Sequence, residues 1–312
     1  MQSYVIVATK GRAAETATLF DYLLRQERRP DGVYVIGAEP ADIDGLDTHP
    51  LRRVVPVTLL VSDTAGSTVQ RNRGIEALLR DIGRTEHGPN DTSARRWFAA
   101  FFDDDFRPHE TWLRNCALVL NEQPDVIGMT GQVLADGVKS RGIGETDAQR
   151  YLSGALPPLE HWASGDERRD IESGYGCNMA FVDRAVRVCR FDEALPLYGW
   201  QEDRDYTSQA LKLGRFVYEP SCRGVHLGTK KGRTSGVRFG YSQIANPIFL
   251  VKKNTMERRN AYAFITRHLL SNLYHSVRAD PVFDYRGRLW GNMLALVDFA
   301  CGTSDPRRIL KM

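Results

Sequence analysis

Residues 97–106 read WFAAFFDDDF, an apolar run that ends in three adjacent carboxylates, Asp103, Asp104 and Asp105. An apolar run of this length is typical of a buried strand. Carboxylates at the tip of such a strand repel one another and lose part of their hydration. A divalent cation or a bound ligand compensates for that cost, and oxygen ligands favour Mg2+ or Mn2+ over Zn2+. The alternative interpretation is a solvated acidic turn after the strand.

Strands and helices are predicted to alternate on the N-terminal side of this stretch. Short apolar runs predict strands at 4–8, 32–36 and 53–60, and the spacing of apolar residues predicts helices at 13–26 and 74–82. Such alternation indicates a parallel sheet with helices on both faces. Ligands of such sheets bind at the carboxyl ends of the strands, which is where the aspartate triplet is expected.

The C-terminal side has a different character. Residues 137–169 are rich in Gly, Pro and charge, which predicts a long excursion or flexible insertion rather than a domain. Strand-like residues return at 173–181, where the glycines indicate either close approach to a ligand or a simple tight turn. A basic, Gly-rich stretch at 228–236 then precedes helical patterns at 260–275 and 288–301.

The composition is that of a globular protein, with 42% hydrophobic and 26% charged residues. The 42 Lys and Arg against 39 Asp and Glu give a net charge of +3, which suits an anionic substrate and is too weak to indicate nucleic acid binding. No secretory signal or membrane-spanning run is apparent, so we expect a cytoplasmic protein. Buried, reduced thiols are expected for the five scattered cysteines, Cys116, Cys177, Cys189, Cys222 and Cys301.

Several motifs occur in one order along the chain. An Arg-Asn-x-Gly element at 71–74 precedes the aspartate triplet, a Gly-rich segment at 174–176 follows it, and residues 198–206 read YGWQEDRDY. This order, over roughly residues 3–226, resembles the bacterial family 2 glycosyltransferases. The resemblance implies a glycosyltransferase-A fold, an α/β architecture whose mixed, Rossmann-like sheet is flanked by helices. It places the nucleotide-sugar-binding and catalytic domain at 1–227, and a basic loop and C-terminal helical extension at 228–312.

A divalent cation, Mn2+ or Mg2+, is implied for the donor pyrophosphate, where it stabilises the leaving group as a Lewis acid. Asp105 is expected to be a direct metal ligand because it is last in the triplet and furthest toward the cleft. In parts of the family a histidine at the position of His226 completes the coordination. The alternative for His226 is a structural role.

The resemblance also assigns residues to the nucleotide-sugar donor. Asp103 or Asp104 is expected to face the ribose or to order the site, although Asp104 could instead cap the following turn. Arg71 is expected to neutralise a phosphate or steady the ribose, because its fork of donors matches phosphate geometry. The alternative for Arg71 is an exposed arginine at a helix start.

Further donor contacts are expected after the first two strands. Thr9 and Arg12 follow the first strand, where the nucleotide of the family commonly lies, although Arg12 could simply be solvated. The aspartate that often holds the base in the family is missing from its usual place, and Glu39 or Asp42 could substitute, or the base could be held differently. The basic residues of 228–236 could close over the pyrophosphate as a lid or form a solvated loop.

An acceptor hydroxyl needs a base, and the pair Glu202 and Asp203 offers two carboxylates. By resemblance Asp203 is the base and Glu202 supports it or binds the acceptor, while Trp200 and Gly176 are expected to contact the acceptor. The alternative is that the pair forms the acidic first turn of a helix. One base, with no second carboxylate placed as a nucleophile, implies direct displacement with inversion, as does the family.

The resulting hypothesis is an inverting, metal-dependent hexosyl- or deoxyhexosyltransferase of bacterial surface polysaccharide or glycoconjugate synthesis. Its expected partners are a nucleotide-sugar donor and a carbohydrate or lipid-linked acceptor, with contact at the inner face of the membrane and without nucleic acid. The sequence leaves two alternatives open, a sugar nucleotidyltransferase on a related fold and a non-catalytic carbohydrate-binding protein. A Rossmann dehydrogenase is disfavoured because no GxGxxG follows the first strand.

Overall fold

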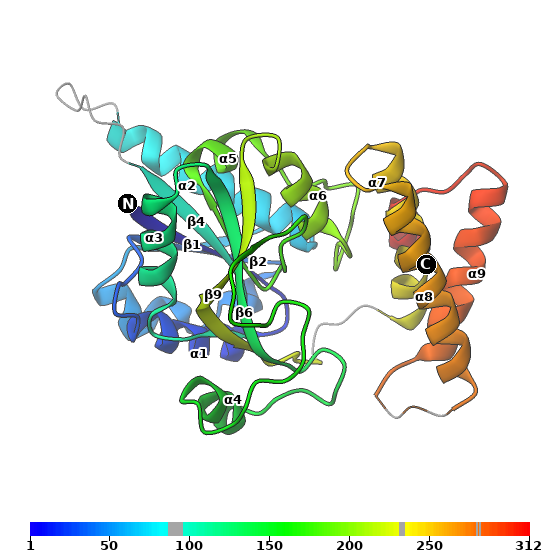
Figure 1. Cartoon of the computed structure of the whole chain (residues 1–312), viewed down its shortest axis with the longest axis horizontal. Coiled ribbons are helices and arrows are strands. Elements are labelled where there is room, and N and C mark those ends of the chain that lie inside the picture. The colour runs from blue at the N-terminus through cyan, green and yellow to red at the C-terminus, as the bar shows by residue number, and fades with distance from the viewer. Residues whose placement is uncertain (87–95, 231–234, 279, 281) are drawn as a thin grey trace.

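A nine-stranded mixed sheet forms the centre of the molecule (Figure 1). The computed structural model describes residues 1–86, 96–230, 235–278, 280 and 282–312. The strand order is β3-β2-β1-β4-β8-β6-β9-β5, and β7 pairs with β9 off this path. The strands are β1 (Gln2–Thr9), β2 (Gly32–Gly37), β3 (Val57–Val61), β4 (Trp97–Asp103), β5 (Phe106–Pro108), β6 (Val126–Asp136), β7 (Arg169–Asp170), β8 (Asn178–Val182) and β9 (Arg215–His226).

One half of the sheet is parallel, as the alternating pattern predicts. Strands β3, β2, β1 and β4 all run the same way, and every residue of β2 is buried. Strand β8 is antiparallel to both β4 and β6, so β6 and its parallel partner β9 point the same way as β1 and β4. The carboxyl ends of these six strands, β1–β4, β6 and β9, therefore lie at one edge of the sheet, which is the usual place for a ligand in such sheets.

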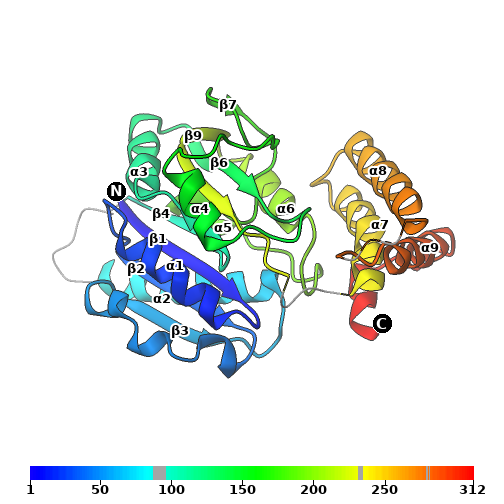
Figure 2. The ribbon, with the colours of Figure 1, turned by 90° about the horizontal axis from the view of Figure 1, so that it is seen from below.

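Helices cover both faces of the sheet (Figures 1 and 2). Apolar side chains of α1, such as Leu19, Phe20 and Leu23, join the main core, and so do Ile75 and Leu78 of α2. The helices of the sheet domain are α1 (Ala13–Leu24), α2 (Ser67–Glu86), α3 (Trp112–Glu122), α4 (Glu145–Leu152), α5 (Asp183–Val188) and α6 (Glu202–Ala210).

Two predicted boundaries are wrong. The helix expected at 74–82 already begins at Ser67, so the Arg-Asn-x-Gly element lies inside α2. The strand expected at 53–60 begins only at Val57, because Pro50–Arg53 forms a short 3-10 helix. Pro50 favours the first turn of the short helix, which takes Arg53 out of the predicted strand, and Pro56, just before Val57, has no amide hydrogen to donate to a neighbouring strand.

The excursion at 137–169 contains a helix, α4, that the sequence analysis did not predict. Its residue Ala148 is buried in a small apolar cluster with Leu134 of β6 and Val225 of β9. Glu145 at its start accepts a hydrogen bond from the buried Arg107, with Nε 3.0 Å from Oε2. These contacts attach α4 to the sheet edge near the carboxyl ends of β6 and β9.

Three C-terminal helices form a bundle at one end of the molecule (Figure 2). They are α7 (Gly236–Lys252), α8 (Arg258–Ser276) and α9 (Tyr285–Ala300), and the last two lie within three residues of their predicted bounds. Lys253, directly after α7, attaches the bundle to the sheet domain, because its Nζ lies 2.6 Å from Asp192 and 2.8 Å from Asp205. No helix in the described part of the chain has both the length and the apolar character of a transmembrane span.

The cysteine prediction is correct for four of the five thiols and wrong for Cys301. Cys116, Cys177, Cys189 and Cys222 are buried, whereas Cys301 is exposed. Cys301 caps the C-terminus of α9, outside the apolar clusters of the core, which explains its exposure.

Candidate functional site

The two expected metal ligands, Asp105 and His226, lie together with Asp103, which was expected to face the donor, at the edge where β4 and β9 end. One ligand atom from each of Asp103, Asp105 and His226 lies within 4.8 Å of the other two. Asp103 ends β4, His226 ends β9, and Asp105 follows β4 in the turn to β5. The Oδ1 atom of Asp105 is buried, accepts no hydrogen bond among the described residues, and lies 3.3 Å from His226 Nε2. A buried carboxylate oxygen without a donor is expected where a cation binds, so these residues fit a divalent metal ion.

A second layer of side chains orients His226. Its Nδ1 lies 3.1 Å from Asp136 Oδ1, so Nε2 is the ring nitrogen that faces Asp105. Tyr175 donates its hydroxyl to Asp136 Oδ2 at 2.6 Å, and His161 Nε2 lies 3.4 Å from the same oxygen. Burial works against ionisation of Asp136, but the hydrogen bonds from His161, His226 and Tyr175 hold its pKa below its usual range. A carboxylate on the far nitrogen of a metal-binding imidazole is a common second-layer arrangement.

The sequence analysis missed this second layer. A signal was present, because Asp136 ends the buried run 126–136 just as Asp103 ends the run 97–103. Because Asp136 and His226 are paired in the β6–β9 register, their side chains lie next to each other. His161 and Tyr175 carry no comparable sequence signal, because they reach the site only through the course of the chain from 137 to 175.

Asp104 is hydrogen-bonded to side chains at and just after the end of β1, and its expected role of facing the ribose or ordering the site stays a prediction. Its Oδ2 accepts a hydrogen bond from Thr9 Oγ1 at 2.8 Å, and its Oδ1 accepts one from Arg12 Nη1 at 2.9 Å. Arg12 also lies 3.5 Å from Asp105 and donates to the carbonyl of Thr229 at 2.9 Å. The expected donor residues Thr9, Arg12 and Asp104 therefore lie together, next to the candidate metal site of Asp103, Asp105 and His226.

Arg71 is buried, so the alternative of an exposed helix-start arginine is wrong. Its guanidinium donates to Asp103 Oδ1 at 2.8 Å, to the Gly176 carbonyl at 2.9 Å and to Glu202 Oε1. Arg71 thus joins α2, the end of β4 and the start of α6. Its donors are engaged by protein oxygens here, so its expected contact with the donor phosphate or ribose stays a prediction.

Glu202 and Asp203 open α6 and have different surroundings. Glu202 is buried against Arg71, whereas Asp203 is partly exposed. The two oxygens of Asp203 each accept one backbone hydrogen bond, from Gly176 at 3.1 Å and from Arg204 at 2.7 Å. Burial raises the pKa of Asp203, and it raises the pKa of Glu202 well above its ordinary value. Of the two, Asp203 is oriented by the backbone and still accessible to an incoming hydroxyl.

Gly176 lies close to charged side chains of the protein, while the predicted close approach to a ligand is not tested. A Cβ at this position would lie 3.1 Å from Glu202 Oε1 and 3.5 Å from the Arg71 guanidinium. Its amide donates to Asp203 and its carbonyl accepts from Arg71, so the backbone of Gly176 lies between these two charged side chains. Its expected contact with the acceptor stays a prediction.

Two predicted residues lie outside this group of contacts. The Trp200 ring is in an aromatic cluster with Phe239, Phe264 and His268, so it packs on α7 and α8, and sugar stacking on it stays a prediction. Glu39 is exposed in the loop after β2. The neighbouring Asp42 is buried and accepts hydrogen bonds from the amides of Gly11, Ala38 and Glu39, which joins the loops after β1 and β2.

The basic stretch 228–236 is described only in part. Lys230 donates from Nζ to the carbonyls of Gly137 and Val138, at 2.9 and 3.0 Å, and the Thr229 amide donates to Asp105 Oδ2 at 2.7 Å. These contacts attach the start of the stretch to the metal-binding edge. Residues 231–234, with Lys231 and Arg233, lie outside the described residues, so the predicted lid is untested.

Comparisons with known proteins identify the fold. Neither a scan against protein-family models nor a search of curated proteins gives a match. Solved structures do match, among them S. aureus TarS 1–349 at a TM-score of 0.57 and 16% identity, covering 99% of this chain and 82% of that one. The same TarS region in complex with UDP-GlcNAc matches at a TM-score of 0.55 and 15% identity, covering 99% and 83%. The mannosyltransferase PcManGT from Pyrobaculum calidifontis, in complex with GDP-Man and Mn2+, matches at 0.52 and 16%, covering 99% and 78%.

These matches confirm the predicted glycosyltransferase-A fold, a mixed sheet flanked by helices. The chain covers only 55% of the longer S. aureus TarS structure, at a TM-score of 0.51 and 16% identity. Identities of this size carry the fold alone, so the activity must be argued from the residues at the strand ends.

Proposed function

We propose that the chain is an inverting, metal-dependent glycosyltransferase of the family 2 type. It moves a hexosyl or deoxyhexosyl group from a nucleoside diphosphate sugar to a hydroxyl of a carbohydrate or lipid-linked acceptor. Bacterial surface polysaccharide or glycoconjugate synthesis is the process in which we expect it to act. One observation carries the proposal: a metal-binding triad and a backbone-oriented carboxylate occur at the same edge of a glycosyltransferase-A sheet.

The triad supports binding of the donor diphosphate. Asp103, Asp105 and His226 would hold Mn2+ or Mg2+, which supplies positive charge to the pyrophosphate leaving group. The chain adds Arg12, whose guanidinium already lies among carboxylates at this edge and can also turn toward a phosphate oxygen. Asp104 holds that arginine in place, and Thr9 holds Asp104. We expect Glu39, in the loop after β2, to contact the nucleotide.

Asp203 is the residue that we expect to take the acceptor proton. Its two backbone hydrogen bonds fix the carboxylate, and lone pairs remain on both oxygens for a hydroxyl. Burial raises its pKa, which makes it a stronger base than an exposed aspartate once it is ionised. Glu202 is held by Arg71, which suits a supporting or acceptor-binding role. The acceptor oxygen, losing its proton to Asp203, would bond to the anomeric carbon on the face opposite the leaving diphosphate as the bond to the phosphate oxygen breaks, which gives inversion.

Release of nucleoside diphosphate from a panel of nucleotide sugars, with Mn2+ or Mg2+ and simple carbohydrate acceptors, tests the proposal. We expect release that needs metal and that falls by about 10²–10⁴ in Asp203→Asn, with Val188→Ser at the exposed end of α5 as a control. Release of inorganic pyrophosphate would instead indicate a sugar nucleotidyltransferase. Sugar binding without any release would indicate a non-catalytic carbohydrate-binding protein.

A further inference from the structure

The outer side of the C-terminal bundle carries large apolar side chains that nothing in the described chain covers. On α8 they are Tyr262, Leu270, Leu273, Tyr274 and Val277, with Tyr262 71% and Val277 80% exposed. On α9 they are Trp290, Met293 and Val297. We name these eight residues the apolar face. Single exposed apolar residues are normal, but a contiguous set of this size indicates a binding surface.

The spacing shows that the apolar face is continuous on each helix. On α8 the residues 262, 270, 273, 274 and 277 recur at intervals of eight, three, one and three, which keeps them within about a third of the helix circumference. On α9 residues 290, 293 and 297 follow the three-four spacing of one stripe. Other residues of both helices, including Ile265 and Leu269 of α8 and Leu294 of α9, pack inward against α7.

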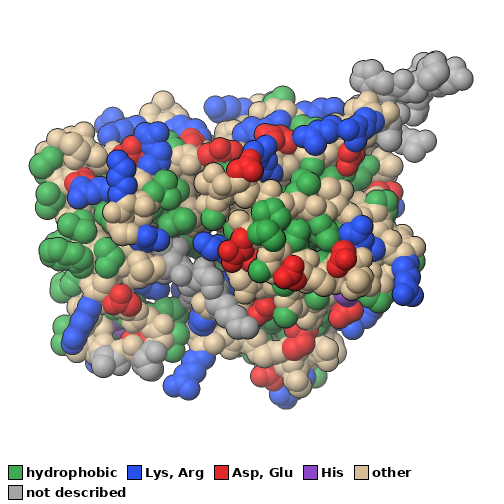
Figure 3. Space-filling view, turned by 180° about the vertical axis from the view of Figure 1, so that it is seen from behind, with side chains coloured by type: hydrophobic (Ala, Val, Ile, Leu, Met, Phe, Trp, Pro, Cys, Tyr) green, Lys and Arg blue, Asp and Glu red, His purple; other side chains and the backbone are tan. Residues whose placement is uncertain are grey.

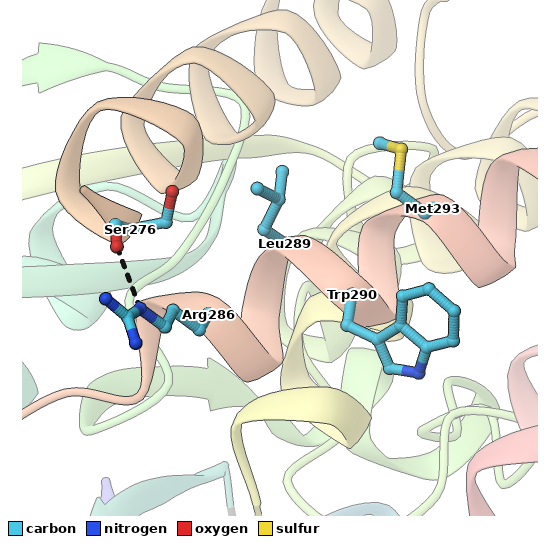
Figure 4. Close-up of a pocket in the computed structure, with 5 residues that line it drawn as sticks. All are labelled: Ser276, Arg286, Leu289, Trp290 and Met293. Carbon is cyan, nitrogen blue, oxygen red and sulfur yellow. Dashed lines mark hydrogen bonds between the residues drawn. The ribbon is translucent and has the colours of Figure 1, made fainter.

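The two stripes meet in a shallow pocket between the end of α8 and the start of α9. Ser276, Arg286, Leu289, Trp290 and Met293 line it, and Figure 4 shows the side chains of Leu289 and Met293 on the side of α9 that faces α8. Arg286 donates from Nε to the Ser276 carbonyl at 3.1 Å, which holds the helix ends together. The apolar face is thus one surface formed by two antiparallel helices.

Basic residues border this surface and acidic residues are nearly absent. Residues 258–278 contain four arginines, Arg258, Arg259, Arg267 and Arg278, all exposed, and no Asp or Glu. Residues 228–312 contain 15 Lys and Arg against 5 Asp and Glu, whereas residues 1–227 contain 27 against 34. Figure 3 shows hydrophobic side chains gathered at the end of the molecule formed by these helices, with Lys and Arg around them.

The acidic residues of the bundle are used locally. Asp298 is buried and accepts from Tyr241 Oη at 2.6 Å, Asp284 caps α9 through the Gly287 amide, and Asp305 pairs with Arg307 at 2.7 Å. Asp280 accepts from two backbone amides of its own loop, and Glu257 lies 3.8 Å from Arg259. Arg259, Arg307 and Arg308 thus have acidic partners, whereas among the described residues Arg258 and Arg267 of α8 and Arg278 just after it form no salt bridge.

We propose that the apolar face binds the surface of an anionic lipid bilayer, with the two helices lying along the membrane plane. Aromatic and aliphatic side chains would enter the boundary between headgroups and acyl chains, and the arginines would contact lipid phosphates. Arg278 already lies 4.7 Å from the Tyr274 ring, which keeps a cation beside an aromatic group at the expected headgroup level. A symmetric contact with a second copy is disfavoured, because it would bring the like-charged arginines of two α8 helices together.

Vesicle binding by the whole chain tests the proposal. We expect the protein to co-sediment with vesicles of phosphatidylcholine and phosphatidylglycerol, more weakly at high salt, and only poorly with pure phosphatidylcholine. Leu273→Ser with Trp290→Ser should weaken binding at least about tenfold, since two large apolar side chains leave the bilayer. Arg259→Gln with Arg267→Gln and Arg278→Gln should weaken it about fivefold per arginine.

The matched control is Val188→Ser, because Val188 is 66% exposed at the end of α5, away from the C-terminal helices. This variant should bind vesicles like the unaltered protein. Equal binding to neutral and anionic vesicles, or binding that both C-terminal variants retain, would overturn the proposal. So would self-association in lipid-free solution that the Leu273 and Trp290 substitutions abolish, since a second copy would then occupy the surface.

A dye on Cys301 can report membrane insertion of the apolar face in a protein whose apolar residues are all unchanged. It is the exposed thiol of the five, and it lies eleven residues after Trp290, on the same side of α9. An environment-sensitive dye on Cys301 should shift to the blue with anionic vesicles, and an unchanged spectrum would count against insertion of this face. Vesicle binding and sugar transfer are measured separately. A negative result in one assay therefore does not decide the proposal that the other assay tests.

Discussion

Two arginines at the edge of the sheet each hold two carboxylates, but they do so in different surroundings. The side chain of Arg71 is 3% exposed and pairs with Asp103 and Glu202, whereas that of Arg12 is 17% exposed and pairs with Asp104 and Asp105. We call these sets the Arg71 cluster and the Arg12 cluster. The buried Arg71 cluster also satisfies the Gly176 carbonyl, while Arg12 reaches the Thr229 carbonyl at the start of the basic stretch.

This difference in burial indicates that the two arginines have different roles. A fully buried guanidinium is stable only while its partners remain, so Arg71 fixes the relative positions of β4 and α6. A partly exposed guanidinium loses less when it changes partners, so Arg12 is free to exchange an aspartate for a phosphate. We therefore expect the Arg71 cluster to govern stability and geometry, and the Arg12 cluster to govern donor and metal binding.

The largest effect is expected for Asp105→Ala, on the metal side of the Arg12 cluster. Loss of a ligand should weaken metal binding and remove several kcal/mol of stabilisation of the leaving group, which lowers turnover by at least about 10³-fold. Calorimetry of nucleoside diphosphate binding, with and without Mn2+, measures the binding part. Unchanged affinity with and without metal, together with turnover that survives a chelator, would show that Asp105 has no metal role.

Asp203→Asn should reduce kcat by about 10²–10⁴, because it removes the proposed base and keeps the size of the side chain. Donor affinity should stay within about threefold, since Asp203 belongs to neither arginine cluster. Glu202→Gln, the partner of Arg71, should act mainly on the KM of the acceptor. If Glu202→Gln abolishes turnover while Asp203→Asn does not, the two roles are exchanged, and if neither matters the site lies elsewhere.

The two arginines should differ most clearly in stability. Arg71→Met leaves Asp103, Glu202 and the Gly176 carbonyl without their donor, so we expect a loss of about 3–5 kcal/mol in the free energy of unfolding. Arg12→Met removes a partly exposed pair, and we expect a loss of about 1 kcal/mol or less. Denaturant unfolding of both variants measures the difference. Equal losses would contradict the proposed difference in roles.

The sequence predicts which residues belong to this site better than it predicts the contacts between their side chains. The carboxylates at the end of β4 follow a readable apolar run, whereas the pair Glu202 and Asp203 and the histidine at the end of β9 were found through the order of motifs that the family resemblance rests on. The expected contact of Arg71 with the donor stays a prediction, but its position between Asp103 and Glu202 was not predicted. Such a bridge depends on how α2 packs over the sheet, and one sequence carries no direct signal for that packing.

The same limit explains Asp136 and the apolar face. Asp136 follows a strand as plainly as Asp103 does, but its role appears only when β6 and β9 pair in register. The helices at 260–275 and 288–301 were predicted from their spacing, yet α8 has apolar residues on both its inner and outer sides. Periodicity finds a helix, but it does not say which of two apolar sides the core covers.

Asp136→Asn should weaken the metal dependence of turnover without abolishing it. The change removes a negative charge from the far side of His226 and loosens the ring, and second-layer substitutions of this kind typically cost 10–100-fold in metal affinity. Titration of activity with Mn2+ measures the shift, and saturating metal should restore most of kcat. A variant with unchanged metal dependence would place Asp136 outside the second layer of the site.

The smallest expected effect is a displacement of the acid limb of the pH profile. A general base acts only when ionised, so kcat/KM falls as pH falls through the pKa of Asp203. Burial raises that pKa, so the limb should lie above the value of about 4 that an exposed aspartate gives. The backbone hydrogen bonds from Arg204 and Gly176 and the positive charges of Arg71 and Arg204 oppose this rise in the pKa of Asp203. Arg71→Gln should therefore move the limb to higher pH and Arg71→Lys should not, while Arg12→Gln should leave it in place. Profiles recorded below the unfolding temperature of each variant decide the matter, and a limb that follows Arg12 instead of Arg71 would reverse the roles assigned to the two clusters.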